Sequence, residues 1–340
     1  MEAMATAQIE GRIQRVKQGV REIAYMTGVS SGCTGFLNAT DRLNRTGLYA
    51  FIGHHVVPVG EDAHILSADR LYDRLVHLRK HFDMVSAAEA LAWLRDPEPG
   101  ERLATITFDD GYRDNLTVGL KVLEAASAPA TCFVATEPIL TGKPFWFDLV
   151  RSAVAEGPNA AMSVPWVRAI AEQGGRHLAD ALVHELNQLP PAARDARVAE
   201  FADTLDYDIG SMPPHLQPLS PGELTDLASS PLITIGAHTH THSTVSCCSE
   251  EQLRDELTQN VTALEQLTGR RPHLFAYPKG ATETSSFEIA SLLEEVQLQA
   301  AFTTQRQINR MKSDPWLLGR FPLGAGPVSQ FAWELMQLSF

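Results

Sequence analysis

The 340-residue sequence lacks long apolar runs, and its N-terminus lacks the apolar segment of a secretory signal. No stretch approaches the roughly 20 apolar residues that a membrane-spanning helix requires. Residues 1–25 alternate charged and small side chains, a pattern that does not fit an export signal. We therefore expect a soluble, cytoplasmic protein without a transmembrane segment.

Cysteine is also scarce, and the four cysteines are poorly spaced for metal or disulfide chemistry. No CxxC pair occurs, which disfavours a thiolate zinc site. Cys132 lies in an apolar run and is typical of a small buried side chain. Cys247 and Cys248 are adjacent, and a bond between them would be strained. We expect these thiols and Cys33 to be reduced, as in a cytoplasmic protein.

Positive charge is in deficit, with 28 Lys and Arg against 41 Asp and Glu and a net charge of -13. The field of such a protein repels phosphate, so the composition disfavours nucleic acid or an anionic membrane as a partner, although a local basic patch remains compatible with it. Hydrophobic residues make up 44% of the chain, an ordinary globular content. None of these properties predicts an oligomeric state.

Apolar runs and helical patterns alternate along most of the chain. The pattern predicts strands at 48–57, 103–108, 130–135, 232–236, 273–277, 300–304 and 317–323, with helices at about 67–82, 86–95, 112–126, 249–268 and 285–297 and another starting at 220. Capping boxes at Ser86, Ser220 and Ser249 mark three of the helix starts. This alternation predicts an α/β fold with a parallel sheet, either open or closed into a barrel. In both forms active sites gather at the C-terminal ends of the strands.

Two stretches interrupt the alternation. Residues 1–48 are predicted to form an N-terminal helical arm and a loop rich in Gly, Ser, Thr and Asn. Residues 143–218 start with three aromatic residues and continue as helices with proline-rich breaks, which we interpret as a helical insertion. The main domain is therefore expected to span residues 49–340, with this insertion inside it.

Two adjacent carboxylates, Asp109 and Asp110, follow the strand predicted at 103–108. Their mutual repulsion is unfavourable unless something offsets it, and a bound cation does so, because one carboxylate can ligate it while the other takes a proton. The alternative is a polar turn with an aspartate N-cap, and the dipeptide alone favours that alternative.

Three histidines alternate with threonine directly after the strand predicted at 232–236: His238, His240 and His242. In an extended segment all three face one side, and in a helix His238 and His242 share a face, so two imidazoles can meet one metal in either case. An exposed polar loop is the alternative. One aspartate with two histidines leaves metal positions open for water and substrate, as in a catalytic site. Imidazole ligands suit zinc, cobalt, nickel and iron.

A third group lies in residues 275–280 (FAYPKG), again at a predicted strand end. Pro278 and Gly280 fix a tight turn, and a backbone N–H of this turn can face an oxyanion. A plain turn without chemistry is the simpler interpretation of this segment alone.

Together, TFDDGY at 107–112, HTHTH at 238–242 and FAYPKG at 275–280 resemble the NodB-type polysaccharide deacetylases, carbohydrate esterase family 4. The likeness covers about residues 49–325 without the insertion. It implies a distorted, incomplete (β/α) barrel and a metal-dependent hydrolase that removes an N-acetyl group from an amino sugar or glycan precursor. The implied cofactor is a divalent metal, most simply Zn²⁺, with Co²⁺, Ni²⁺ or Fe²⁺ as alternatives.

The resemblance also assigns roles to the residues of the first two motifs. Asp109 corresponds to the general base and Asp110 to a metal ligand. His238 and His242 match the family's HTxxH ligand pair. His240 lies between them, is not a family ligand, and is expected to contact the substrate or support the loop.

The third motif departs from the family. Ala276 stands where the family often has an arginine that orients the base, and we expect Arg320 to supply that charge. Lys279 replaces the tyrosine that usually follows the proline, and its backbone N–H can still serve the oxyanion. With Tyr277 it is expected on the substrate side of the site.

The family's C-terminal Leu-x-His motif, the source of its general acid, is missing, and no histidine follows Arg320. Some relatives are circularly permuted and carry this strand at the N-terminus. His55, at the end of the strand predicted at 48–57, looks like the equivalent of the histidine in that motif. His54 is the alternative. The competing interpretation of His55 is a strand-end histidine without a catalytic role.

The substrate and the reaction leave alternatives open. Trp146, with Phe145 and Phe147, is expected to stack on sugar rings or to be buried in a core. We expect an intracellular glycan precursor, such as a nucleotide- or lipid-linked sugar, or a small amino-sugar metabolite. Hydrolysis of another C–N bond, such as a formamide or cyclic imide, is a second interpretation. A catalytically inactive glycan-binding protein is a third.

Overall fold

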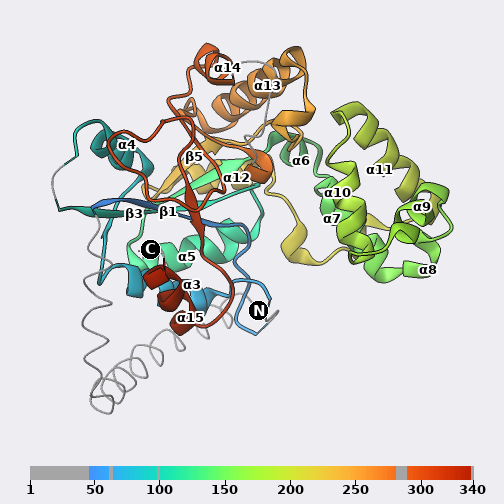
Figure 1. The fold of residues 1–340 in the computed structure, drawn as a ribbon, viewed down its shortest axis with the longest axis horizontal. Coiled ribbons are helices and arrows are strands. Elements are labelled where there is room, and N and C mark those ends of the chain that lie inside the picture. The colour runs from blue at the N-terminus through green and yellow to red at the C-terminus, as the bar shows by residue number, and fades with distance from the viewer. Residues whose placement is uncertain (1–45, 61–63, 98–99, 281–288, 338–340) are drawn as a thin grey trace.

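The computed structural model describes residues 46–60, 64–97, 100–280 and 289–337 (Figure 1). The N-terminal arm predicted over residues 1–48 lies outside the described residues, apart from residues 46–48, and so does Cys33. Residues 47 and 48 already belong to the first strand, which begins one residue earlier than expected.

Eight parallel strands form one sheet in the order β7-β6-β5-β4-β3-β1-β8, with β2 paired to β3. Their apolar runs are nearly continuous, as expected for strands covered on both faces. The strands are β1 (Gly47–Gly53), β2 (Asp83–Met84), β3 (Arg102–Phe108), β4 (Ala130–Val134), β5 (Ile233–Ala237), β6 (Leu274–Ala276), β7 (Ala300–Phe302) and β8 (Arg320–Pro322).

The two ends of this sheet meet. The Thr303 N–H donates to the Leu318 carbonyl oxygen at 2.7 Å, and the Leu318 N–H donates to the Ala301 carbonyl oxygen at 2.9 Å. These bonds join the end of β7 to the segment that leads into β8. The sheet is therefore a nearly closed parallel barrel, and the predicted fold class is confirmed.

Helices connect the strands and cover the outside of the barrel. All three predicted capping boxes are present, at Ser86, Ser220 and Ser249. These helices are α3 (Ala68–Leu78), α4 (Ala87–Arg95), α5 (Leu120–Ala126), α6 (Thr136–Thr141), α12 (Pro221–Ser229), α13 (Glu250–Thr268), α14 (Ile289–Glu295) and α15 (Val328–Gln337). Short 3-10 turns are η2 (Ile209–Ser211), η3 (Pro214–Leu216), η4 (Val245–Cys247) and η5 (Pro278–Gly280).

The helix predicted at 112–126 is shorter than expected. Tyr112 forms an isolated bridge with Pro218, the helix begins at Asp114, and a π-helical turn η1 (Asn115–Gly119) precedes α5. The Asn115 side-chain amide donates to the His54 carbonyl oxygen at 2.7 Å. The start of this segment is therefore shaped by the loop after β1, and local helix propensity does not decide it.

The core divides along the two faces of the barrel wall. Alternate strand residues such as Phe51 and Phe108 pack outward against α3 and α5 in the largest apolar cluster. Their neighbours point inward, where Phe133 and Phe302 contact each other with ring centroids 5.6 Å apart. The period of two along each strand produces this division.

Between α6 and α12 the chain forms a second group of helices, which lies beside the barrel in Figure 1. We call residues 143–218 the helical segment. It has its own buried cluster around Phe145, Val150 and Phe201. Its helices are α7 (Trp146–Glu156), α8 (Pro158–Ala161), α9 (Pro165–Gln173), α10 (Leu178–Leu186) and α11 (Pro191–Leu205).

Among the described helices, none has the length and apolar character needed to cross a bilayer. The cysteines at 132, 247 and 248 are free thiols.

Candidate active site

The ends of β3 and β5 bring Asp110, His238 and His242 together. One ligand atom from each residue lies within 4.8 Å of the other two, and all three side chains are buried. Asp110 Oδ1 is 3.3 Å from His238 Nε2 and 3.1 Å from His242 Nε2. Gly111 makes the turn after the two aspartates possible, because its φ is +95° and an added Cβ would lie 3.0 Å from Val134.

The hydrogen bonding of these residues fits a cation. His238 Nδ1 lies 2.7 Å from the Ala276 carbonyl oxygen and donates its hydrogen to that oxygen, so Nε2 is the ring nitrogen that faces Asp110. Asp110 Oδ1 is buried and accepts no hydrogen bond from the described residues. Acceptor atoms that face one another in a buried site are favourable when a cation lies among them.

Electrostatics keep these groups in the ligating form. Burial lowers the pKa of His242 to about 4, so its imidazole is neutral at pH 7. Burial alone would raise the pKa of Asp110, but His242 and His238 outweigh it and hold the pKa well below its usual value. At neutral pH the site therefore offers one carboxylate and at least one neutral imidazole.

Two residues of α13 hold the histidine loop in place. Asn260 accepts a hydrogen bond from the His238 N–H at 3.1 Å and donates to the Thr239 carbonyl oxygen at 2.7 Å. Glu256 accepts the N–H groups of His240 and of the next residue, each at 2.8 Å. The sequence analysis missed both. The available signal was a pair of polar residues four positions apart on the otherwise apolar face of this helix.

Asp109 points to a different partner. Its carboxylate accepts two hydrogen bonds from the Arg320 guanidinium, at 2.6 and 2.8 Å, and Arg320 also donates to Thr107 Oγ1 at 3.0 Å. Burial alone would raise the pKa of Asp109, but Arg320 outweighs it and the pKa lies below its usual value. Asp109 is therefore ionised at neutral pH and stays outside the Asp110 cluster.

His55 has a carboxylate partner of its own. Its Nδ1 is 3.0 Å from an Asp114 oxygen, and its ring centroid lies 3.8 Å from that of Tyr112. Burial lowers the pKa of His55, but the Asp114 carboxylate more than compensates, so the pKa is raised overall. His54 is exposed beside it. Asp114 was not predicted as a site residue, because nothing in the sequence relates it to a histidine 59 positions away.

These groups open into a cavity of about 300 Å³. The barrel supplies most of its wall and α7 supplies the rest. It is lined by His54, His55, Asp109, Asp110, Tyr112, Phe147, Asp148, Arg151, His238, His242, Lys279 and Thr304. Among the residues predicted for the site, Asp109, Asp110, His55, His238, His242 and Lys279 share this cavity.

Four predicted site residues lie outside the lining. Trp146 packs in the core of the helical segment, 5.2 Å from the Arg194 guanidinium, so the cavity wall is formed by its neighbour Phe147. Tyr277 is buried against Phe275. His240 Nδ1 is 2.8 Å from Thr136 Oγ1, which fits loop support. Arg320 reaches the site only through Asp109.

The helical segment adds Asp148, which the sequence analysis did not consider. The Tyr112 hydroxyl donates to its carboxylate at 2.5 Å, and burial raises the pKa of Asp148 to about 6. The interpretation of residues 143–218 as an addition to the barrel does not predict a cavity residue from its first helix.

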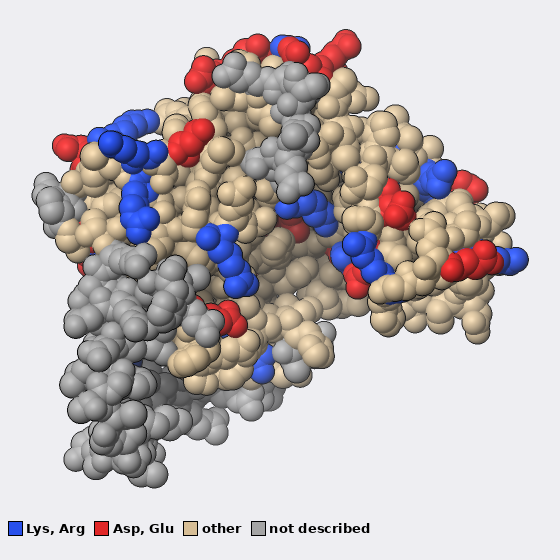
Figure 2. Space-filling model, in the orientation of Figure 1, with Lys and Arg blue, Asp and Glu red and all other residues tan. Residues whose placement is uncertain are grey.

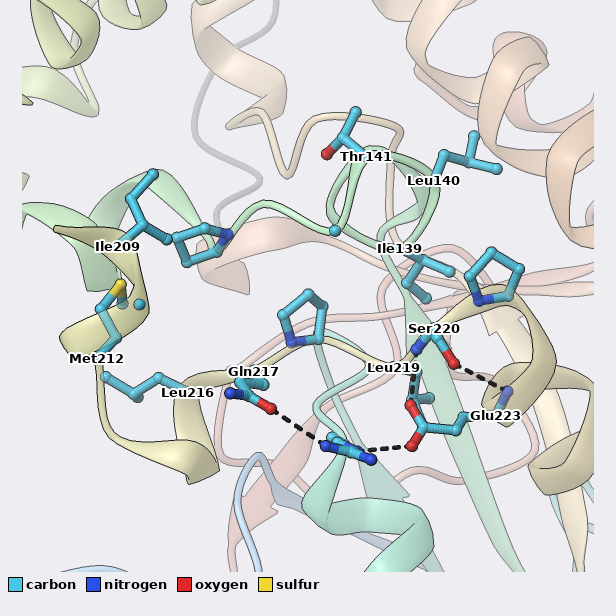
Figure 3. A pocket seen from close by; sticks show the side chains of 16 residues that line it. Ile139, Leu140, Thr141, Ile209, Met212, Leu216, Gln217, Leu219, Ser220 and Glu223 are labelled. Carbon is cyan, nitrogen blue, oxygen red and sulfur yellow. Dashed lines mark hydrogen bonds and ion pairs between the residues drawn. The ribbon is translucent and has the colours of Figure 1, made fainter.

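A larger cavity of about 600 Å³ lies between α6, the end of the helical segment and the start of α12 (Figure 3). It shares no lining residue with the smaller cavity. The charged residues in its lining are Arg113 and Glu223, which form an ion pair with 2.6 Å between nitrogen and oxygen. Arg113 also donates a hydrogen bond to the Gln217 side chain at 3.2 Å. The reactive side chains therefore belong to the smaller cavity.

Comparison with known families identifies the family of this chain. The sequence model of the family described as polysaccharide deacetylase matches residues 96–173 and 193–299, more than half of the chain. The chain belongs to the polysaccharide deacetylase family. The match to this deacetylase family is interrupted only at 174–192, so the extent of the insertion predicted at 143–218 stays a prediction.

Solved structures of deacetylases share the fold. The deacetylase PplD of Streptococcus pyogenes, in complex with acetate, aligns with a TM-score of 0.56 and 14% identity over 86% of this chain and 98% of its own. IcaB from Ammonifex degensii aligns with a TM-score of 0.56 and 18% identity over 87% of this chain and 98% of its own. The polysaccharide deacetylase BC0361 of Bacillus cereus aligns with a TM-score of 0.51 and 14% identity over 85% of this chain and 69% of its own. A search of curated proteins gave no match.

Proposed function

We propose that the protein is a metal-dependent hydrolase that removes an N-acetyl group from an amino sugar or glycan precursor. Membership of the polysaccharide deacetylase family supports deacetylation of a glycan. The observation that carries the proposal is the convergence of Asp110, His238 and His242 beside an ionised Asp109 in one cavity.

Asp110, His238 and His242 would hold the cation, with Zn²⁺ the simplest choice and Co²⁺, Ni²⁺ or Fe²⁺ acceptable to the same donors. When bound, a divalent cation supplies a Lewis acid that lowers the pKa of water and polarises a carbonyl. The donor set is incomplete for a closed structural site, which leaves room for water and substrate.

The side chains around this centre divide the proton transfers. Asp109 accepts the proton of the attacking water, and Arg320 keeps the carboxylate ionised and oriented for that transfer. Attack on the acetyl carbonyl carbon produces an oxyanion, which the Lys279 backbone N–H would stabilise. His55, oriented by Asp114, donates a proton to the departing amine, and acetate leaves.

Two features support an active enzyme over an inactive glycan-binding protein. Ala276 stands where the family often has an arginine that orients the base. In this chain the Arg320 guanidinium contacts both carboxylate oxygens of Asp109. The C-terminal histidine is missing, but His55 lines the same cavity as Asp109.

The test is a deacylation screen of the metal-reconstituted protein. N-acetylated sugars of increasing size, including nucleotide- and lipid-linked ones, are incubated with the enzyme beside N-formyl sugars and cyclic imides. We expect acetate release from at least one N-acetyl sugar. Turnover of only formyl or cyclic substrates would replace the proposal with hydrolysis of another C–N bond, and binding without any turnover would favour the inactive interpretation.

A further inference from the structure

Two cations, Lys279 and Arg151, line the active-site cavity and have no side-chain role in the proton transfers above. They come from different elements, because Lys279 lies in the turn after β6 and Arg151 lies on α7. In Figure 2, Lys and Arg side chains stand on both sides of the hollow between the barrel and the helical segment. Asp and Glu side chains stand among them, and the cavity lining itself also includes Asp109, Asp110 and Asp148.

Lys279 is held close to the metal-binding candidates. Its ammonium nitrogen lies 4.8 Å from the centroid of the Phe147 ring, and the same ring lies 5.0 Å from the His242 ring. Its backbone φ of +61° is unusual for a residue with a side chain, and such conformations cluster at functional sites. Within the described residues no carboxylate lies in ion-pair distance of this ammonium group.

Arg151 reaches the cavity because it follows Phe147 by four residues on α7, so both occupy one face of the helix. Its ionic partner is Asp180 at 3.4 Å, and both side chains are about half exposed. A pair of this kind contributes little and is readily exchanged. The planar guanidinium retains donors that match a phosphate or carboxylate.

The carboxylates of the cavity are already engaged. Asp109 is paired with Arg320, Asp110 belongs to the proposed metal site, and Asp148 accepts a hydrogen bond from Tyr112. The two cations are therefore the charged groups of this cavity that are most available to a ligand.

We propose that Lys279 and Arg151 bind an anionic group, a phosphate or carboxylate, carried by the N-acylated sugar close to its acyl group. This inference rests on the proposed deacylase function and defines the class of its substrate. Three sources share the chemistry: a sugar phosphate monoester, the diphosphate of a nucleotide-linked sugar, and the carboxylate of an amino-sugar acid.

The kinetic test compares matched anionic and neutral substrates. N-acetylglucosamine 1-phosphate, uridine-diphosphate-linked N-acetylglucosamine and N-acetylmuramic acid, whose carboxylate is on the 3-O substituent beside the acetamido group, are each compared with the neutral methyl glycoside of N-acetylglucosamine. In Lys279→Met and Arg151→Gln, we expect the anionic-to-neutral ratio of kcat/KM to fall about tenfold, as for the loss of a charge-assisted hydrogen bond. Lys279→Arg should keep most of the ratio. The anionic substrate whose ratio falls most in the two variants identifies which of the three anionic groups the site binds.

Matched controls remove equal charges elsewhere. Lys121→Met and Arg176→Gln alter exposed cations that line no described cavity, and we expect the ratio to stay unchanged. A ratio that is the same in wild type, Lys279→Met and Arg151→Gln would overturn the inference while leaving the deacylase proposal intact.

A binding measurement removes the dependence on turnover. Glucosamine 1-phosphate and glucosamine are titrated into each protein by calorimetry. We expect the phosphate to bind more tightly to wild type, with the advantage weakened by added salt and lost in Lys279→Met. Equal binding of both ligands would contradict the inference. Absence of all N-acyl hydrolysis together with a Lys279-dependent phosphate preference would sink the deacylase proposal and keep the anion site.

Discussion

Arg320 and Asp109 are joined by two hydrogen bonds of 2.6 and 2.8 Å, although 211 positions separate them in the chain. Arg320 begins β8 and Asp109 follows β3, and β1 lies between these strands in the sheet. Arg320 therefore reaches past β1 to Asp109, and its Nε donates to the Thr303 carbonyl oxygen after β7 at 2.9 Å. It also sets the charge of the proposed base.

Removing Arg320 should leave Asp109 as an unpaired buried charge. We expect Arg320→Met to lower the free energy of unfolding by about 3–5 kcal/mol. The pKa of Asp109 would rise, so the acidic limb of the activity profile would move to higher pH. The double variant Arg320→Met/Asp109→Asn should recover part of the stability. Denaturant unfolding of the three proteins measures this, and an unchanged stability of Arg320→Met would refute it.

The pair of His55 and Asp114 makes a pH-dependent prediction. Asp114 raises the pKa of His55, which keeps the proposed general acid protonated to higher pH. Asp114→Asn preserves a hydrogen-bond acceptor and removes the charge, so the pKa of His55 should fall and the basic limb of the kcat/KM profile should move to lower pH. Asp226→Asn, an exposed site on α12, is the matched control. A basic limb that does not move would exclude His55 as the group it reports.

Asn260 should control metal affinity without touching the metal. It fixes the backbone on both sides of His238, and outer partners of this kind typically contribute 10–100-fold to metal affinity. We expect Asn260→Ala to weaken metal binding by about that factor and to cost about 1–3 kcal/mol of stability. Gln259→Ala, exposed on the same helix, should do neither. A chelator competition titration measures the affinity, and equal affinities in the two variants would argue against this role.

The barrel and the gathering of reactive groups could be predicted because both follow from local patterns. Strand and helix periodicity alternated clearly, and parallel strands carry their C-terminal ends to one edge. Asp110, His238 and His242 each follow such a strand end, so their meeting required only the correct fold class.

Other features depend on contacts that no local pattern encodes. Trp146 and Phe147 are adjacent aromatic residues, and only the docking of α7 decides that Phe147 faces the cavity while Trp146 packs against Arg194. Asp148 was missed for the same reason. Asp114 was missed because its partner His55 follows a different strand, and a separation of 59 positions is not a recognisable motif.

The central claim is that one divalent ion is held by Asp110 and two imidazoles while Asp109 stays free beside it. Metal analysis of the purified wild type, Asp109→Asn and Asp110→Asn tests this most directly, with folding checked by circular dichroism. We predict one ion per chain in the wild type and in Asp109→Asn, and loss of the ion in Asp110→Asn. A wild type without metal after reconstitution, or an Asp110→Asn variant that retains it, would contradict the account.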